Sequence, residues 1–339
     1  MSKQIVWNED GADLPMVDVY LPMMKAAALI SAGQLRLFEA LADGPLPLPE
    51  LARAIGASEF GAGHLADFLV ALGYLTQSDA GFANTARAGW FTGKHASGVD
   101  YTAGLLWTAE SWSLMSNLTA AVRKGAPAKT LWESMEERPH WGPVFSSYMH
   151  AFAQHLGPDL LARVSLPDGA ARLLDLGGSH GLHSIAFCRK YPGLDAVIVD
   201  LPTALTKTAA TLAEAKLSDR ISLRPGNLLA GDWGEGYDAV FYLSVAHNQT
   251  ADDNRAVIAH VGRVLRPGGL LLIHEYLSGT PLDLYDAAFR LTLLVETATR
   301  TYSFDELASW LTSSGFETPT RIDLDPREKG SLVVAKKQG

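Results

Sequence analysis

One stretch constrains the fold of this chain more than any other, the glycine-rich segment LLDLGGSHGLHSIAF at residues 173–187. An apolar run leads to Asp175, the glycines Gly177, Gly178 and Gly181 follow, and a helix-forming stretch begins directly after them. Glycines in such a turn let the backbone approach a ligand closely, and the start of the helix presents free amide donors. We therefore expect a strand, a turn and a helix that bind a nucleotide-like ligand.

A second acidic residue supports this ligand. The next apolar segment, AVIVD, ends in Asp200, whose carboxylate can accept hydrogen bonds from both hydroxyls of a ribose. The spacing alone also suits NAD, so an NAD-dependent oxidoreductase is one alternative. Three details favour S-adenosylmethionine (SAM), with S-adenosylhomocysteine (SAH) as its product. An acidic residue stands two positions before the first glycine, a strict G-x-G-x-x-G is missing, and the motif lies late in the chain.

From Ala171 onward the sequence alternates short apolar strands with helices, which is typical of an open, doubly wound, Rossmann-like α/β sheet. We expect a further helix opened by Ser303, where Glu306 completes a capping-box spacing. The expected strands cover 172–176, 196–200, 221–223, 239–243 and 270–275, with further extended segments at 316–323 and 331–335. The expected helices lie near 181–190, 203–216 and 251–265, and the sequence Arg-Pro-Gly-Gly at 266–269 is expected to stop the last one before its strand.

The first third of the chain has a different pattern. Residues 16–41 keep apolar residues at helical spacing, two short helices follow, and a hairpin is expected around Gly81. This order is that of a winged helix, which can read DNA, but the expected second helix at 59–72 contains no Lys or Arg. A dimerisation surface is therefore favoured over the non-enzyme alternative, a ligand-responsive winged-helix regulator.

These patterns predict three regions. Residues 1–105 form an all-helical, winged-helix-type dimerisation domain, apart from the hairpin. Residues 106–165 form a helical connector that contributes to a substrate pocket, and residues 166–339 form the SAM-binding domain. The aromatic-rich stretch at 98–165 is expected to be helical throughout, and its Trp107 is a candidate acceptor contact.

Composition narrows the possible partners. A net charge of −9 argues against nucleic-acid binding, which needs clustered Lys and Arg. The single cysteine, Cys188, excludes an internal disulfide and a cysteine-based zinc site, and the histidines show no metal-ligand spacing, so no metal is expected. The sequence shows no signal peptide and no apolar run long enough to span a membrane, so we expect a cytoplasmic protein.

Several motifs taken together resemble a known family. These are LLDLGGSHG, VDLP at 199–202, RISLRPGNLL, LRPGGLLLIHE and FDELASWLTSSGF. They are similar to those of SAM-dependent natural-product O-methyltransferases related to caffeic acid O-methyltransferase, and the likeness extends over nearly the whole chain. It implies a homodimer that methylates a small aromatic or heteroaromatic acceptor of secondary metabolism.

The resemblance also assigns roles around the cofactor. Gly177 and its neighbours would face the methionine part of SAM, and Asp200 would bind the ribose. The family commonly has Gly-Asp where this chain has Gly226-Asn227, although an asparagine can still hydrogen-bond adenine. The remaining cofactor contacts implied are Leu201, Asn227, Leu228 and Phe145, and Met149 lies four residues after Phe145 on the same helix face, where it would contact the acceptor.

The candidate catalytic base is His247, which follows the strand AVFYLSVAH, because ligands bind outside the carboxyl ends of parallel strands. The resemblance makes it the counterpart of the family's catalytic histidine and makes Glu275 the residue that orients it. Family members usually continue His-Asp-Trp, whereas Asn248 follows here, and Thr301 stands where a second acidic residue is usual. A capping or packing role for His247 and a merely solvated Glu275 stay open.

The acceptor pocket is expected to be lined from the helical segment 282–300. Leu282, Tyr285, Phe289, Leu293 and Glu296 recur there at steps of three or four, and we predict Phe289 and Leu293, together with Asn248, as pocket walls. The two missing carboxylates leave other chemistries open. These are methylation at carbon or nitrogen, and a protein that binds SAM without using it as a methyl donor.

Overall fold

The computed structural model describes residues 15–95, 98–279, 284–325 and 330–339, and it divides into two units, Met1–Ala109 and Glu110–Gly339. Helix α5 (Thr102–Met115) spans the boundary between them. Each unit has its own buried core, so each is described by itself. Among the described residues, none of the helices is long and apolar enough to cross a membrane.

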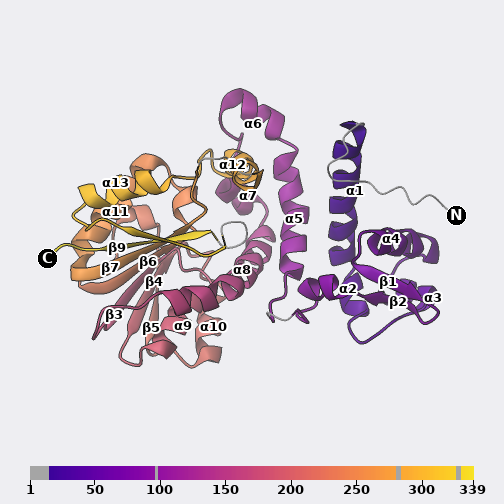
Figure 1. The fold of residues 1–339 in the computed structure, drawn as a ribbon, viewed down its shortest axis with the longest axis horizontal. Helices are drawn as coiled ribbons and strands as arrows, with labels where there is room; N and C mark the ends of the chain where they lie inside the picture. Colours follow the sequence, from indigo (N-terminus) through magenta and orange to yellow (C-terminus); the bar gives the residue numbers. More distant parts are fainter. Residues whose placement is uncertain (1–14, 96–97, 280–283, 326–329) are drawn as a thin grey trace. The chain divides into compact units, whose positions relative to one another are not determined.

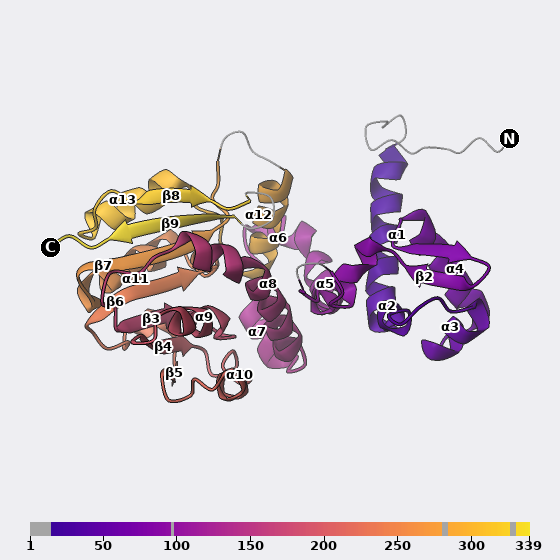
Figure 2. The same ribbon diagram turned by 60° about the horizontal axis from the view of Figure 1, so that its bottom comes forward.

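The first unit consists of the 20-residue helix α1, several shorter helices and one hairpin. The hairpin strands pair antiparallel from Leu75↔Asn84 to Ser78↔Gly81 and pack against α3 and α4 (Figure 2). Gly81 is required here because a Cβ at this position would lie 2.2 Å from the carbonyl oxygen of Leu46. The elements are α1 (Pro15–Gln34), α2 (Leu37–Ala40), α3 (Leu48–Ala54), α4 (Glu59–Ala71), β1 (Leu75–Ser78), β2 (Gly81–Asn84) and the 3-10 helix η1 (Ala86–Phe91).

The single helix predicted over residues 16–41 is wrong in one respect. The chain breaks after α1 because Arg36 adopts a left-handed conformation, with φ at 54°, and α2 begins at the next residue. The break turns both Leu37 and Phe38 into the core of the unit, where neither side chain is exposed to solvent. Helical periodicity continues across this point, so the sequence pattern does not reveal the break.

The second unit opens with helices and continues into the sheet. Three helices follow α5, namely α6 (Leu118–Lys124), α7 (Leu131–Glu137) and α8 (Trp141–Arg163). Helix α7 begins with a capping box in which the side chains of Thr130 and Glu133 each accept from the other's backbone N–H. Helix α8 is the longest of the described helices, and it leads into the first strand of the large sheet.

The large sheet has seven strands in the order β5-β4-β3-β6-β7-β9-β8 (Figure 1). The first five run parallel, and β9 is antiparallel to both of its neighbours. The strands are β3 (Arg172–Leu176), β4 (Asp195–Asp200), β5 (Ile221–Pro225), β6 (Tyr237–Leu243), β7 (Leu265–Glu275), β8 (Thr320–Asp323) and β9 (Ser331–Lys336). The helices are α9 (Leu182–Lys190), α10 (Thr208–Ala215), α11 (Ala251–Val264), α12 (Leu284–Glu296) and α13 (Phe304–Ser313), with the 3-10 helices η2 (Leu228–Ala230) and η3 (Ala246–Asn248).

Both faces of this sheet are covered (Figure 1). Alternate strand residues point to opposite faces, so Leu174 packs with α11 and α13 while its neighbour Leu173 packs with α8 and α9. Burial on both faces explains why β3, β4 and β6 read as nearly continuous apolar runs. The predicted fold class, a doubly wound α/β sheet preceded by a mainly helical region, is confirmed.

Strand β7 begins earlier than predicted. Helix α11 ends at Val264 as expected, but Leu265 already pairs with Tyr237, and the next pair is Ala239↔Leu270. The residues 266–269 therefore belong to an irregular start of the strand rather than to a separate stop. The helix predicted at 203–216 is shorter than expected and begins only at Thr208.

Candidate active site

The glycine turn lies at a reversal of the sheet's winding. The connection from β3 to β4 contains α9, and the connection from the adjacent β6 to β7 contains α11. These two helices pack on opposite faces of the sheet. Ligands of open α/β sheets bind at the carboxyl ends of the strands at such a point. Gly177 follows β3 there with φ at 76°, and a Cβ on it would lie 2.5 Å from Cγ2 of Val245, which follows β6. The two loops therefore pack as closely as glycine allows.

The other two glycines shape the turn. A Cβ on Gly178 would lie 2.5 Å from Cγ of Asp175, and Gly181 starts α9 in a left-handed conformation. Asp175 is buried and its Oδ2 accepts a hydrogen bond of 2.7 Å from the hydroxyl of Ser184. Burial raises the pKa of this carboxyl to about 7. The turn thus holds a buried acid directly beneath the backbone that would face a ligand.

Asp200 lies beside the same turn, at the end of β4. Its Oδ2 accepts from the backbone N–H of Ser179 at 2.9 Å and its Oδ1 from that of Leu201 at 2.7 Å. Burial raises its pKa to about 6, although these two hydrogen bonds lower it. An ionised carboxylate has about four acceptor positions, so two remain for the hydroxyls of a ribose. The turn and Asp200 therefore fit a nucleoside such as that of SAM.

The other residues predicted to bind the cofactor differ in their contacts and in their exposure to solvent. Asn227 is brought next to Asp200 because the N–H of Gly226 donates to the Asp200 carbonyl at 2.8 Å. The side-chain Oδ1 of Asn227 accepts from the N–H of Leu229 at 2.9 Å and so caps η2. The NH2 group of the same side chain is left for a ligand. Leu201 is exposed and Leu228 half-buried.

Helix α8 approaches the turn from another side. The rings of His150 on α8 and His180 in the turn lie 6.4 Å apart, and Nζ of Lys207 lies 3.2 Å from the hydroxyl of Ser147. Phe145 and Met149 are half-buried on this helix, and Phe145 meets Trp132 edge to face at 6.2 Å. Trp107 is buried in the first unit, so its role as an acceptor contact stays a prediction.

The candidate base and its partner meet at the ends of neighbouring strands. Nδ1 of His247, in η3 after β6, lies 2.6 Å from Oε2 of Glu275, the last residue of β7. Oε1 of Glu275 accepts the backbone N–H of His247 at 3.2 Å, and the Glu275 side chain is only 3% exposed. A solvated Glu275, one of the alternatives left open by the sequence, does not agree with this burial.

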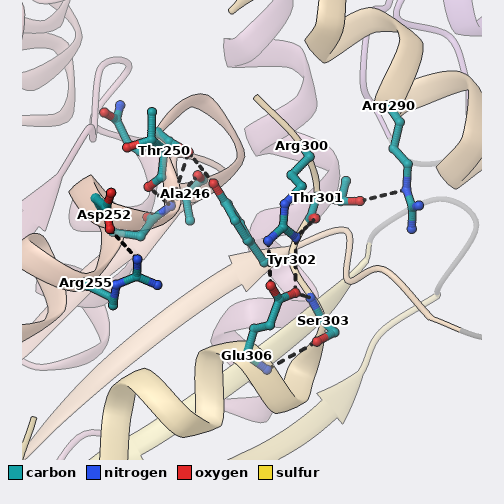
Figure 3. Close-up of polar contacts among 12 residues, drawn as sticks. Ala246, Thr250, Asp252, Arg255, Arg290, Arg300, Thr301, Tyr302, Ser303 and Glu306 are labelled. Atoms are coloured by element: carbon teal, nitrogen blue, oxygen red, sulfur yellow. Dashed lines mark hydrogen bonds and ion pairs between the residues drawn. The ribbon is translucent and has the colours of Figure 1, made fainter. Parts of the chain in front are cut away.

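The loop that carries His247 is held by buried hydrogen bonds. Nδ2 of Asn254 donates to the carbonyl of Ala246 at 2.9 Å, and the hydroxyl of Tyr302 donates to the carbonyl of Gln249 at 2.6 Å. Figure 3 shows the Tyr302 side chain reaching this loop from the segment before α13. The N-cap of α11 is Thr250 and not His247, so the capping role considered for His247 belongs to another residue.

Thr301, at the position of an expected carboxylate, takes part in a separate set of contacts. Its hydroxyl donates to Oδ1 of Asp286 at 3.0 Å. The same hydroxyl accepts from Nε of Arg290 at 3.2 Å (Figure 3). Both partners lie on α12. The side chain is buried, and its polar contacts bind α12 to the following segment instead of reaching His247.

A cluster of aromatic rings lies beside His247. Phe289 of α12 lies edge to face with His247, with ring centroids 5.1 Å apart and an interplanar angle of 74°. The ring centroid of Tyr276 lies 5.5 Å from that of Phe289 and 5.0 Å from that of Tyr285. The ring centroid of Phe152, on α8, lies 6.5 Å from that of Tyr276. The predicted wall residue Leu293 is buried one turn further along α12, and Asn248 is half-buried in η3.

Sequence reasoning missed two residues of this region. Glu296, the last residue of α12, is 8% exposed, and burial raises its pKa to about 7 while His247 lowers it. Tyr148 of α8 has its pKa raised to about 12 by burial, with further contributions from Tyr285 and Glu296. Glu296 follows Phe289 and Leu293 in the same helical stripe, which was a signal that the sequence contained.

Comparison with known proteins gives matches over most of the chain. Residues 116–317 match a family described as the O-methyltransferase domain, and residues 18–94 match one described as the O-methyltransferase dimerisation domain. The chain is 31% identical to 3-hydroxy-5-methyl-1-naphthoate 3-O-methyltransferase of Streptomyces sahachiroi, over 88% of each protein. It is 27% identical to L-tyrosine C(3)-methyltransferase of Streptomyces lavendulae, over 91% of this chain and 88% of that protein.

The fold is shared with solved structures. Human N-acetylserotonin methyltransferase in complex with SAM superposes with a TM-score of 0.83 at 20% identity, and the match covers 98% of this chain and 99% of that one. At this level of identity the comparison supports the fold alone. The match extends over both units of the chain.

Proposed function

Because the chain belongs to the O-methyltransferase family and is a SAM-dependent methyltransferase, we propose that it methylates a hydroxyl group of a small aromatic acceptor, with His247 as the base. One observation carries this proposal, the 2.6 Å contact between Nδ1 of His247 and Glu275 beside the glycine turn. A neutral histidine whose Nδ1–H donates to a carboxylate has its lone pair on Nε2. That nitrogen would accept the proton of the hydroxyl.

Each residue of the site has a role in this reaction. SAM supplies an electrophilic methyl group when it is bound. Asp200 and the glycine turn would hold its nucleoside and methionine parts, and His247 would remove the proton as the acceptor oxygen attacks. Glu275 would keep the imidazole in the required tautomer and stabilise its positive charge, while Phe289 and its aromatic neighbours would exclude water.

The rings around His247 support an aromatic acceptor, since flat aromatic surfaces pack well against one another. The name of the Streptomyces sahachiroi relative, which specifies a hydroxynaphthoate, is consistent with this class and with a natural-product pathway. A second candidate is methylation at carbon. It is favoured by the relative named as a tyrosine C(3)-methyltransferase and by the Asn248 that replaces the usual Asp after the histidine.

The proposal is tested with purified protein, SAM and a panel of phenolic, naphtholic and aminoaromatic acceptors. We expect a product heavier by one methyl group, with fragmentation placing that group on oxygen. Placement on carbon or nitrogen would replace the oxygen assignment by the second candidate. Titration calorimetry with SAM and with NADH is the control, and binding of NADH in place of SAM would contradict the cofactor.

We also propose a homodimer formed through the first unit. The match to the dimerisation domain supports it, as do the apolar side chains exposed on α1, Val19, Tyr20 and Met23. A mass equal to two chains is expected by light scattering at micromolar concentration, and Met23→Asp is expected to shift it toward one chain. A single-chain mass for the unaltered protein would contradict the dimer. The cytoplasmic location expected from the sequence stays a prediction.

A further inference from the structure

Two threonine hydroxyls form a short chain of hydrogen bonds that ends on the main chain of His247. The hydroxyl of Thr299 donates to the carbonyl oxygen of His247 at 2.5 Å. Oγ1 of Thr297 lies 2.5 Å from Oγ1 of Thr299. A hydroxyl has one hydrogen to donate, and Thr299 uses its own on His247, so Thr297 is the donor between the two threonines. The chain therefore has one direction, from Thr297 through Thr299 to His247.

The chain of hydroxyls begins directly after helix α12. The N–H of Thr297 donates to the carbonyl of Leu293 at 2.9 Å, and its hydroxyl lies 3.3 Å from that oxygen, farther than from Thr299. Phe289, Leu293 and Thr297 follow one another at steps of four, so they share one face of the helical path. The ring of Phe289 lies edge to face with that of His247, with centroids 5.1 Å apart. The segment from α12 to Thr299 thus contacts both the ring and the main chain of His247.

A strained residue lies between the two threonines. Ala298 has φ at 59°, in the left-handed region that residues with a Cβ rarely adopt. Its side chain is exposed, so burial of this side chain does not explain the conformation. Such strain persists where the surrounding contacts hold it, and it is found most often at functional sites. The turn at Ala298 places the hydroxyls of Thr297 and Thr299 within hydrogen-bonding distance of each other.

The main chain of His247 is held on both sides. Its N–H donates to Oε1 of Glu275 at 3.2 Å, and its carbonyl accepts from Thr299. The segment that carries Thr299 contacts the same loop again, because the hydroxyl of Tyr302 donates to the carbonyl of Gln249 at 2.6 Å (Figure 3). Glu275 fixes the rotation of the imidazole ring, and Thr299 ties the residue to the end of α12. A catalytic group misplaced by about 1 Å can lose about 100-fold in rate.

We propose that Thr299 is a positioning residue, which holds His247 in place relative to the predicted wall residues of α12 and is itself oriented by Thr297. This inference rests on the proposed function, because it takes His247 as the base. Thr299 would act on the reaction only through His247. Its hydroxyl should therefore affect the rate only while the imidazole is present.

The first test compares initial rates of the full-length protein and its variants. Thr299→Val keeps the shape and removes the hydroxyl, and it is expected to lower kcat about 10-fold while changing SAH affinity and the KM of the acceptor less than about 3-fold. Thr299→Ser should restore kcat to within about 3-fold, and Thr297→Val should lower it less than Thr299→Val does. In protein that already carries His247→Ala, adding Thr299→Val should change the residual rate less than about 2-fold.

The matched control is Thr292→Val. The hydroxyl of Thr292 donates to the carbonyl of Ala288 at 3.3 Å within the same helix, so this variant loses a comparable hydrogen bond and should keep its kcat. Retained SAH binding by each variant shows that the protein is folded.

A second measurement does not depend on the reaction. Nδ1 of His247 lies 2.6 Å from Oε2 of Glu275, and a proton in so short a bond to a carboxylate gives an NMR signal far downfield that exchanges slowly with water. In the SAH complex this signal is identified by its loss in His247→Ala. Thr299→Val is expected to broaden or abolish it, whereas Thr299→Ser and Thr292→Val should retain it.

The inference is overturned if Thr299→Val leaves both kcat and the Nδ1 signal unaltered. It is also overturned if Thr299→Val lowers the rate by the same factor with and without His247, since the hydroxyl would then act independently of the base. Failure of the proposed function gives a different result, an unaltered kcat for His247→Ala. In that case the Nδ1 signal alone decides whether Thr299 positions the ring.

Discussion

His247 and Glu275 are joined by two hydrogen bonds, one from the ring and one from the backbone. Nδ1 of His247 lies 2.6 Å from Oε2, and the N–H of the same residue donates to Oε1 at 3.2 Å. The carboxylate therefore fixes both the position of the main chain and the rotation of the ring. Because His247 follows β6 and Glu275 ends β7, this pair is placed by adjacent parallel strands of the sheet.

Replacing His247 tests whether proton removal contributes to the rate. His247→Ala is expected to lower kcat by about 100-fold or more, since general-base catalysis typically contributes 10²–10⁴-fold. Glu275→Gln should lower kcat less, because the ring keeps its place but its developing charge is no longer compensated. The measurement is initial-rate kinetics with product detection by mass spectrometry, and SAH affinity, which should stay unchanged, is the control. An unaltered kcat for His247→Ala would reduce the residue to a packing role.

The glycine turn gives a prediction about cofactor binding. A Cβ at position 177 would lie 2.5 Å from Val245 on a backbone with φ at 76°, so Gly177→Ala combines a clash with backbone strain. We expect it to weaken SAH binding by about 10-fold or more, because strain of this kind costs about 1–3 kcal/mol. Gly193→Ala is the matched control, since a Cβ there would meet nothing within 4 Å and the backbone is not left-handed. Equal SAH affinities for the two variants would contradict the close packing of the turn.

The fold could be predicted closely because the local signals agree with the tertiary structure. The strand at 172–176, the glycine turn, the capping box at Ser303 and the hairpin at Gly81 all lie where the sequence predicts them. Residues close in sequence determine each of these elements. The strand shows as a continuous apolar run because both sheet faces are covered, and the other elements follow from helix capping or turn geometry. The break at Arg36 could not be predicted, since it depends on how Leu37 and Phe38 enter the core of the unit.

The candidate site was predictable only in part. The positions of His247, Glu275 and Asp200 follow from the rule that parallel strands present side chains at their carboxyl ends. Glu296 ends α12, and its helical spacing from Phe289 and Leu293 is visible in the sequence, but the interaction of its carboxyl with His247 depends on where the tertiary structure places the end of that helix. Thr301 shows the converse, because the position where an acid was expected contributes hydrogen bonds to α12 instead.

Glu296 gives a prediction about stability and pH. Burial raises its pKa from 4.5 to about 7, so the folded protein keeps this carboxyl protonated where the unfolded chain has ionised it. The stability that the protonated form contributes is fully present below about pH 4.5 and is lost as the pH rises through about 7. Glu296→Gln removes this loss, so the ligand-free variant should melt at about the same temperature as the unaltered protein at pH 5 and about 2–6 °C higher at pH 8.

The measurement is thermal unfolding followed by circular dichroism at several pH values. Glu214→Gln, at an exposed position, is the control and should show no such trend. Since other buried acids such as Asp175 titrate in both proteins, only the difference between variant and unaltered protein is compared. A difference in melting temperature that stays constant from pH 5 to pH 8 would show that Glu296 does not titrate as its burial requires.

Asp200 gives the final prediction, on the pH dependence of cofactor affinity. Its pKa is raised to about 6 by burial, and its two oxygens already accept from Ser179 and Leu201. Only the ionised form has acceptor positions left for both ribose hydroxyls, so SAH should bind with constant affinity above about pH 7 and up to about 10-fold more weakly for each unit below 6. SAH is the probe because it lacks the sulfonium charge of SAM, so that the electrostatic contribution of this charge does not add a second pH dependence. Asp200→Asn should bind SAH about 10- to 100-fold more weakly at pH 8 and lose most of the decline below pH 6, because an amide oxygen accepts fewer hydrogen bonds and does not ionise. Asp219→Asn, at an exposed position, should behave as the unaltered protein does. If the decline below pH 6 persisted in Asp200→Asn, another group would control the affinity, and the ribose contact assigned to Asp200 would have to be abandoned.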